Sequence, residues 1–287
     1  MGPAPIISTS GYKYYMHFLD DHSRYTWIFP LKFKSAFNIF KQFKLLVEKQ
    51  FERKIKCIQT DMVGEYRAFG DFVKQHGIEF RHPCPHTSAQ NGRVECKHRH
   101  ITETGLTLLA QAHMPTRFWW EAFQIATYLI TRLPTIVLQG LNTLEKLSRK
   151  KPDYNSLKPF GCACFPCLRP YQTHKFQFHS TKCVFLGYSD SHKGFKCLNS
   201  TGRTYISRHV IFNEQEFPFS SGFLNTKIPQ SETIVTVLNW FIPVSSQNFS
   251  PSVPSYSHRE TILNFSLTIY ISLVFIYLLL LLLTYYL

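Results

Sequence analysis

The sequence predicts a mixed α/β fold, in which helices flank a central sheet, followed by a small β-barrel and a hydrophobic C-terminal tail. In residues 1–135 the patterns follow one another as hairpin, helix, strand, helix, strand and helix, an order typical of helices packed on a mixed sheet. In residues 158–219 short β-rich runs alternate with Gly and Pro, which favours a barrel of about five strands. Residues 263–287 contain no charged side chain.

The core begins with a predicted hairpin. Residues 12–19 are rich in aromatic side chains and predict a strand, the Asp-Asp-His-Ser segment from Asp20 predicts a turn, and residues 24–31 predict the second strand. Ser35 then caps a helix whose apolar side chains recur every three or four residues as far as Val47.

A strand, a short helix and another strand follow. The apolar run 55–60 predicts a short buried strand, and residues 69–76 predict a helix that Gly77 ends. Residues 79–83 predict the next strand. After residue 60, this helix and the strand that follows it are enough to return the chain to the same edge of the sheet.

Two longer helices complete the core. The first is predicted over 91–113, where Pro115 closes it. Its apolar stripe consists of Val94, Ile101, Leu108 and Ala112. The second is predicted over 118–132 and stops before Pro134, because the residue that precedes a proline avoids the helical conformation.

The chain divides into five predicted segments. These are the core (1–135), a polar linker (136–157), the barrel (158–219), a disordered linker rich in Ser, Pro and Asn (220–262) and the hydrophobic tail (263–287). The tail is long enough to cross a bilayer, which takes about 20 apolar residues. A membrane anchor is therefore one hypothesis for this tail, and a non-functional ending of a degenerate gene copy is the other.

The positive charge is concentrated in the first 219 residues. The formal net charge is +14, and the few charges after Phe219 cancel. Such an excess is typical of proteins that bind a polyanion, nucleic acid above all, although a solvated basic surface is the simpler alternative. The N-terminus shows no apolar signal-peptide region, so we expect an intracellular protein of the nucleus or cytoplasm with free thiols.

The barrel segment carries five cysteines. They are Cys162, Cys164, Cys167, Cys183 and Cys197. Their spacing does not match the paired CxxC pattern of zinc sites, so we interpret them as small buried apolar side chains and predict no zinc.

Two carboxylates stand where metal chemistry would need them. Asp61 ends the predicted strand 55–60, and Glu95 lies in the first turns of the helix 91–113. Acids from different elements can converge on divalent ions that activate a nucleophile. Each also has a plain structural interpretation, because Asp61 can cap a turn and Glu95 can pair with Arg99 four residues on.

Several short motifs together carry a family resemblance. In the core they are Leu19-Asp-Asp-His-Ser-Arg-Tyr-Thr-Trp27, Thr60-Asp61, Cys84-Pro-His-Thr87, Gln90-Asn-Gly92, Lys97-His-Arg-His-Ile101 and Phe118-Trp-Trp-Glu-Ala122. Further on they are Phe160-Gly-Cys162, Phe185-Leu-Gly-Tyr-Ser189 and Tyr205-Ile-Ser-Arg-His-Val210. In this order they resemble the integrase core and the following SH3-like module of copia-type retrotransposon polyproteins, over roughly residues 2–219.

The resemblance implies a ribonuclease H-like core with a DDE-type polynucleotidyl transferase site. It implies that Asp61 and Glu95 are catalytic residues that bind Mg²⁺ or Mn²⁺. It also implies nucleic-acid contacts from the start of the helix 91–113, namely Asn91, Arg93, Lys97, His98 and Arg99.

The sequence departs from the family pattern at the first acid. The family places a catalytic Asp on a strand just ahead of the segment seen here as Gly2-Pro3, whereas no acid precedes Asp20 in this sequence. Asp20 and Asp21 lie at the hairpin turn and do not replace it. We therefore expect an N-terminally truncated and catalytically defective core, because two carboxylates leave one metal ion under-coordinated.

Three functional hypotheses remain. The leading one is an integrase-derived protein that binds DNA without cutting or joining it. The second is an active integrase whose missing Asp comes from a longer N-terminus or from a partner chain. The third is a membrane-anchored basic binding protein of new function. The expected partner is DNA, with a second copy of the chain and a membrane contacted through 263–287 as open alternatives.

Overall fold

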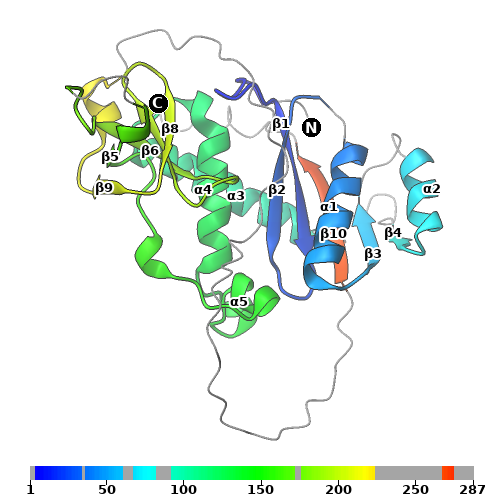
Figure 1. Cartoon of the computed structure of the whole chain (residues 1–287). Helices are drawn as coiled ribbons and strands as arrows, with labels where there is room; N and C mark the ends of the chain where they lie inside the picture. Colours follow the sequence, from blue (N-terminus) through cyan, green and yellow to red (C-terminus); the bar gives the residue numbers. More distant parts are fainter. Residues whose placement is uncertain are drawn as a thin grey trace, which may run out of the picture.

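The computed structural model describes residues 4–33, 36–60, 67–81, 92–171, 176–223 and 267–274. These residues form an α/β core and a small barrel, drawn on opposite sides of Figure 1. The predicted class, a mixed sheet with flanking helices followed by a five-stranded barrel, is confirmed.

The core sheet has five strands in the order β2-β1-β10-β3-β4. Their bounds are β1 Tyr14–Asp20, β2 Thr26–Leu31, β3 Ile55–Thr60, β4 Glu79–Arg81 and β10 Leu267–Val274. β1 runs antiparallel to both β2 and β10, whereas β10, β3 and β4 run parallel to one another. The sheet is therefore mixed, and its middle strand comes from the far end of the sequence (Figure 1).

Helices cover both faces of this sheet. They are α1 Ala36–Phe51, α2 Arg67–Gln75, α3 Gly92–Gln111 and α4 Trp119–Arg132. Successive side chains of β1 point to opposite faces. Phe18 stacks on Phe43 of α1, with 3.9 Å between ring centroids, whereas Tyr15 packs edge-on against Phe123 of α4. This alternation puts α1 on one face and the pair α3 and α4 on the other.

The barrel is a second sheet, in the order β8-β7-β6-β5-β9. The strands are β5 Ala163–Pro166, β6 Cys183–Tyr188, β7 Phe195–Asn199, β8 Thr204–Ser207 and β9 Val210–Asn213. Four of the five cysteines are fully buried around Phe185, and Cys167 is half-buried. Burial is the first cause that raises the pKa of Cys162 to about 12, so this thiol stays protonated and apolar at neutral pH. The packing interpretation of the four buried cysteines is confirmed.

The barrel packs directly on α4. Tyr188 of β6 stacks on Tyr128, with 4.2 Å between ring centroids. Gly187 has a φ of +130°, and a Cβ at that position would come within 2.8 Å of Ile125 Cδ1. A glycine is therefore needed there for both the backbone conformation and the close approach. Core and barrel share one apolar cluster across this contact.

The segment 136–157 is more ordered than the sequence analysis expected. It contains the short helix α5, Thr143–Ser148, whose first turn is capped because the Asn142 side chain accepts a hydrogen bond from the Glu145 amide. The Asn-Thr-Leu-Glu pattern is a capping signal that the composition of the segment concealed.

The hydrophobic tail departs most from expectation. Leu267–Val274, part of the tail for which a membrane anchor was one of two hypotheses, is the middle strand of the core sheet. Across the described ranges, which include only residues 267–274 of this tail, we find no helix with the length and hydropathy of a membrane span. Residues 275–287 and most of the predicted linker 220–262 lie outside the described residues.

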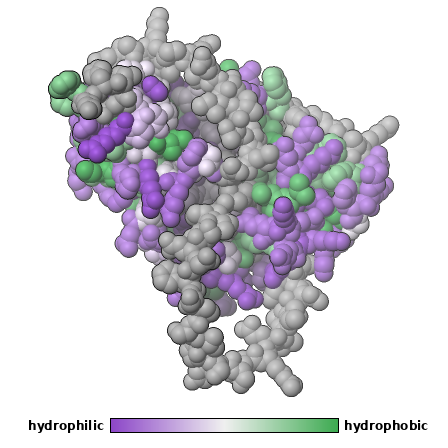
Figure 2. Space-filling model, in the orientation of Figure 1, coloured by the Kyte–Doolittle hydropathy of each residue, from purple (hydrophilic) through white to green (hydrophobic). Residues whose placement is uncertain are grey.

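Figure 2 shows hydrophilic residues over much of the described surface on one face, with small hydrophobic areas between them. This distribution agrees with the high proportion of Lys and Arg in the sequence. Hydropathy does not separate cations from anions, so a polyanion partner is indicated by the formal net charge of +14 and not by this view.

Candidate active site and nucleic-acid interface

The first turn of α3 carries the acid that the sequence analysis selected. Glu95 lies there with an exposed side chain. Asp61 directly follows Thr60, the last residue of β3, but Asp61 and Asn91 both lie outside the described residues. The convergence of Asp61 and Glu95 therefore stays a prediction.

Of the two strands beside β3, β4 begins with Glu79, whereas β10 contains no acid. β10 reads Leu-Thr-Ile-Tyr-Ile-Ser-Leu-Val, and it pairs Ile271 with Thr60 and Tyr270 with Gln59. The neighbour of the strand end that leads to Asp61 thus offers a branched aliphatic side chain where a metal site would need a carboxylate.

A complete two-ion site is not found among the described residues, which do not include Asp61. Within the described part of the chain, no three His, Cys, Asp or Glu side chains gather closely enough to hold a metal ion. The predicted set, Asp61 and Glu95, provides two carboxylates, whereas two hard cations need more oxygen ligands than these supply.

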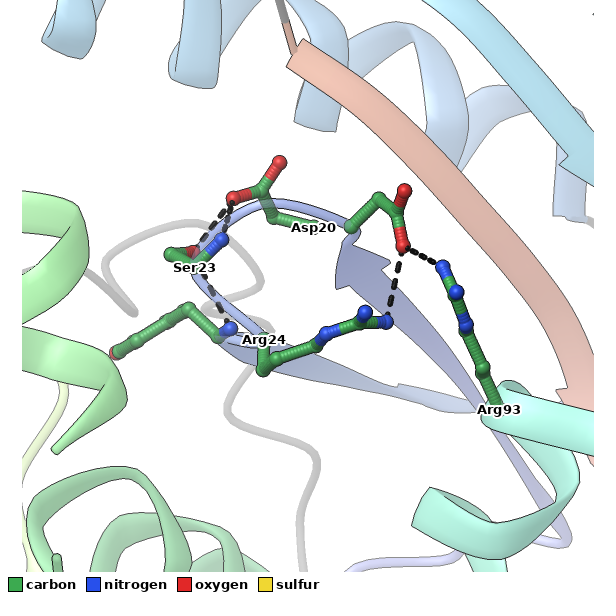
Figure 3. A network of polar contacts seen from close by, with 6 residues as sticks. Asp20, Ser23, Arg24 and Arg93 are labelled. Carbon is green, nitrogen blue, oxygen red and sulfur yellow. Dashed lines mark hydrogen bonds and ion pairs between the residues drawn. The ribbon is translucent and has the colours of Figure 1, made fainter. Parts of the chain in front are cut away.

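The two acids of the hairpin turn are engaged in structural contacts (Figure 3). Asp20 is 1% exposed, and its Oδ2 accepts hydrogen bonds from the Ser23 amide at 2.8 Å and the Ser23 hydroxyl at 2.5 Å. Asp21 Oδ1 accepts from Arg24 at 2.9 Å and from Arg93 of α3 at 2.5 Å. The turn therefore fastens the hairpin to the start of α3.

Arg93 and Lys97 are the first two cations of α3, and their surroundings differ. Arg93 is more than half exposed, and the negative charge of Asp21 raises the pKa of its guanidinium further. Lys97 is half-buried, and burial, followed by the charge of Arg24, lowers the pKa of its amine. Both side chains lie in the first two turns of α3.

His98 points toward the sheet. The Tyr15 hydroxyl lies 2.5 Å from His98 Nδ1, and the imidazole of His17 stacks on that of His98 with 6.3 Å between centroids. Burial lowers the pKa of His98 to about 4 and that of His17 to about 3, with neighbouring positive charge as the next cause. Both imidazoles are therefore neutral at pH 7, so His98 adds no positive charge to the predicted DNA contact.

Arg99 and Cys96 are exposed on the outer side of α3. Arg99 lies one turn beyond Glu95, whereas Arg93 and Lys97 lie one turn apart on another side of the helix. The positive charge available to a phosphate on this part of α3 consists of Arg93, Lys97 and Arg99, partly offset by Glu95.

The barrel offers a second surface. A cleft of about 630 Å³ is lined by Tyr171, Phe176, Phe178, Arg203 and Tyr205 among others. Arg203 lies 5.0 Å from the ring centroid of Tyr205, and Tyr171 packs edge-on against the same ring. Aromatic faces beside an arginine can stack on nucleobases and contact phosphate.

Three parts of this arrangement could not be predicted from the sequence. Asp21 is the partner of Arg93, Tyr15 and His17 are the partners of His98, and β10 is the neighbour of β3. The Asp-Asp-X-Ser pattern signals a side-chain-capped turn, but no local pattern indicates which helix such a turn will contact.

Comparison with known proteins identifies both parts of the chain. A family model described as the retroviral polymerase SH3-like domain matches residues 162–225, which include the barrel. Among curated proteins, the Retrovirus-related Pol polyprotein from transposon RE1 of Arabidopsis thaliana is 48% identical over 80% of this chain, and that from transposon RE2 is 45% identical over 83%. That from transposon TNT 1-94 of Nicotiana tabacum is 36% identical over 91%. The chain spans 16% to 19% of the length of these relatives.

Solved structures give a looser likeness. A chain of the simian T-cell lymphotropic virus intasome in complex with PP2A regulatory subunit B56 gamma matches with a TM-score of 0.40 and 13% identity, over 68% of this chain and 69% of that chain. The HTLV-2 integrase catalytic core domain in complex with magnesium matches with a TM-score of 0.36 and 18% identity, over 47% of this chain and 86% of that chain.

Proposed function

The chain belongs with the Pol polyproteins of copia-type transposons, of which it matches one segment, and we propose that it is an integrase-derived DNA-binding protein with a defective strand-transfer site. The observation that carries the DNA-binding part is the position of the positive charge. Arg93, Lys97 and Arg99 all lie in the first turns of α3, within a region that holds the whole net charge of +14. Phosphate contacts of this kind give affinity without choice of sequence.

Binding is tested with a fluorescent DNA duplex over a range of salt concentrations. We expect the logarithm of the association constant to fall linearly with the logarithm of salt, because each neutralised phosphate releases counterions. Arg99→Ala should lower the slope by about one and weaken binding at low salt. Arg53→Ala is the matched control, since Arg53 is exposed just after α1, on the opposite face of the sheet. Absence of binding at low salt would contradict the proposal.

The proposed catalytic defect is supported by β10. This strand lies beside β3 in parallel register up to the residue before Asp61, and it carries no carboxylate. Loss of a metal-bridging acid removes several kcal/mol of transition-state stabilisation, which corresponds to many powers of ten in rate. We therefore propose that DNA binding persists without DNA joining.

The defect is tested with a strand-transfer and nicking assay in Mg²⁺ or Mn²⁺. The expected result is product at background level under conditions in which the same preparation shifts the DNA. Metal-dependent product that disappears in Asp61→Asn would establish the protein as an active enzyme and refute the defect, while the DNA-binding proposal would stand on its own measurement.

A further inference from the structure

The last described segment of the chain is the middle strand of the core sheet. β10 begins at Leu267, after the barrel and the segment 224–266, and it lies between β1 and β3. Within the described residues, β1 pairs with β2 and β10, and β3 pairs with β10 and β4. β1 and β3 thus meet only through β10, and removing this strand would divide the sheet into two separate pairs of strands.

The hydrogen-bonding edges on both sides of β10 are used along most of its length. On one side the register runs from Tyr15 opposite Val274 to Asp20 opposite Ile269. On the other side it runs from Leu267 opposite Ile55 to Ile271 opposite Thr60. Beyond the strand end, the Asp21 amide donates to the Thr268 carbonyl at 2.9 Å. The gap between β1 and β3 is therefore the width of one strand, with unpaired backbone groups on both sides if it is left empty.

The side chains of β10 fit this gap in one register. Leu267, Ile269 and Ile271 are each at most 5% exposed and belong to the apolar cluster that α1 covers. Thr268 and Tyr270, between them, are half-buried. A shift by one residue would move the three apolar side chains to the opposite face, so the pattern specifies the pairing.

We propose that the gap between β1 and β3 is a strand-binding site, whose ligand is an apolar β-strand that runs parallel to β3 and antiparallel to β1. Residues 267–274 of the same chain fill it, and the segment 224–266 tethers them to the barrel. Such binding uses main-chain hydrogen bonds for affinity and alternate side chains for specificity. Because this strand belongs to the same chain, its binding is an intramolecular event. The fold of the core sheet, and with it the position of α3 on that sheet, then depends on residues 267–274.

The first test uses the native thiol of Cys57. Cys57 on β3 is opposite Thr268 in the parallel register. In a background that carries Cys96→Ser, which removes an exposed thiol, Thr268→Cys should form a bond to Cys57 within one chain under mild oxidation or with a short bismaleimide. Peptide mass spectrometry identifies the bond, and the same variant with Cys57→Ser is the control. A bond between two chains, or no bond to Cys57, would overturn filling of the gap by the chain's own strand.

The second test compares one substitution at two isoleucines. Ile269→Asp places a charge on a fully buried position of β10, whereas Ile211→Asp changes an isoleucine of β9 that is 74% exposed. In Ile269→Asp we expect amide hydrogen exchange in β1 and β3 to speed up at least tenfold, while exchange in β6 and β7 stays unchanged and shows that the barrel is folded. Ile211→Asp should leave both regions unchanged. Unaltered exchange in β1 and β3 of Ile269→Asp would overturn the proposal.

The third test supplies the strand from outside. A synthetic peptide of residues 266–275 with lysines at both ends is added to Ile269→Asp, and exchange in β1 and β3 is measured again. Slower exchange at submillimolar peptide, absent with a scrambled peptide, is the result expected of a strand-binding site. No slowing at millimolar peptide, with the barrel still protected, would mean that the gap does not act as a site.

Discussion

Arg93 at the start of α3 and Asp21 in the hairpin turn form an ion pair, with 2.5 Å between Nη1 and Oδ1. The same carboxylate oxygen accepts a hydrogen bond from Arg24. Arg93 is 55% exposed, so the pair contributes at most about 1 kcal/mol to stability. Its larger effect is electrostatic, because it offsets the positive charge of α3 where we propose that DNA binds.

This relationship predicts that removing the charge of Asp21 strengthens DNA binding. In Asp21→Asn the amide can still accept a hydrogen bond, but Arg93 is free to contact a phosphate. We expect the dissociation constant at low salt to fall by about two- to fivefold and the salt slope to rise by about one. Glu103→Gln, on an exposed site of the same helix, changes the net charge equally and controls for long-range effects. If both variants gained the same affinity for DNA, release of Arg93 from Asp21 would not be the cause of the stronger binding.

His17 and His98 are buried, and we expect their protonation to favour the unfolded state in mild acid. The folded-state pKa values of His17 and His98 are lowered to about 3 and about 4 by burial, whereas both should titrate near 6.5 in the unfolded chain. The unfolded state therefore binds more protons below pH 6.5. Stability is full above this pH and is lost as the pH falls toward 4, by up to about 1.4 kcal/mol per pH unit for each group.

Urea unfolding between pH 4.5 and 7.5 measures this slope. His17→Phe keeps a buried ring without a titrating group, so its free energy of unfolding should depend less steeply on pH than that of the unmodified protein. His192→Gln, at an exposed site of the barrel, is the control variant. Parallel slopes for His17→Phe and the unmodified protein would contradict the assignment.

The order of elements in the core and the barrel could be predicted because each element has a local period. The hairpin, α1, α3 and α4 lie within a few residues of their predicted ranges, since side-chain periodicity and caps are local properties. The barrel followed from the spacing of Gly and Pro between short β-rich runs.

β10 could not be predicted in the same way. Its alternation of apolar and polar residues lies inside a longer uncharged run, and that run as a whole has the composition of a membrane span. Its pairing with β1 joins residues that are far apart in the sequence, for which no local signal exists. The same reason explains why α3 was predicted with its acid and cations, but without Tyr15, His17 and Asp21 as their neighbours.

Because α3 packs closely on α4 at Gly105, we expect a side chain at this position to destabilise the fold. A Cβ on Gly105 would come within 2.3 Å of the ring of Phe123, which is itself fully buried. Gly105→Ala should therefore lower the free energy of unfolding by about 1–3 kcal/mol, the usual cost of overpacking. Gly70→Ala in α2 is the matched control, because a Cβ there meets nothing within 4 Å. It should stabilise the protein by about 0.5–1 kcal/mol through helix propensity.

The carboxyl group of Glu121 in α4 is buried, and we expect it to contribute less to stability at neutral pH than in acid. Glu121 is 7% exposed, and its Oε1 accepts hydrogen bonds from the hydroxyls of Thr9 and Ser10, at 3.0 Å and 3.2 Å. Its Oε2 is buried and has no hydrogen-bond partner in the described structure. Burial is the first cause that raises its pKa above the ordinary value. The charged form is thus disfavoured, and the contribution of this group to stability is full at low pH and is lost as the pH rises through its folded-state pKa.

Glu121→Gln should remove this pH-dependent loss. The amide oxygen can still accept from Thr9 and Ser10, and no charge has to be buried. We expect the free energy of unfolding to rise by about 1 kcal/mol at pH 7 and the difference to shrink toward pH 4, where the protonated glutamate predominates in both states. Urea unfolding at the two pH values measures it, with Glu103→Gln at an exposed site as the control. A lower stability of Glu121→Gln at pH 7 would show that the ionised carboxylate itself stabilises the contact with the N-terminal segment.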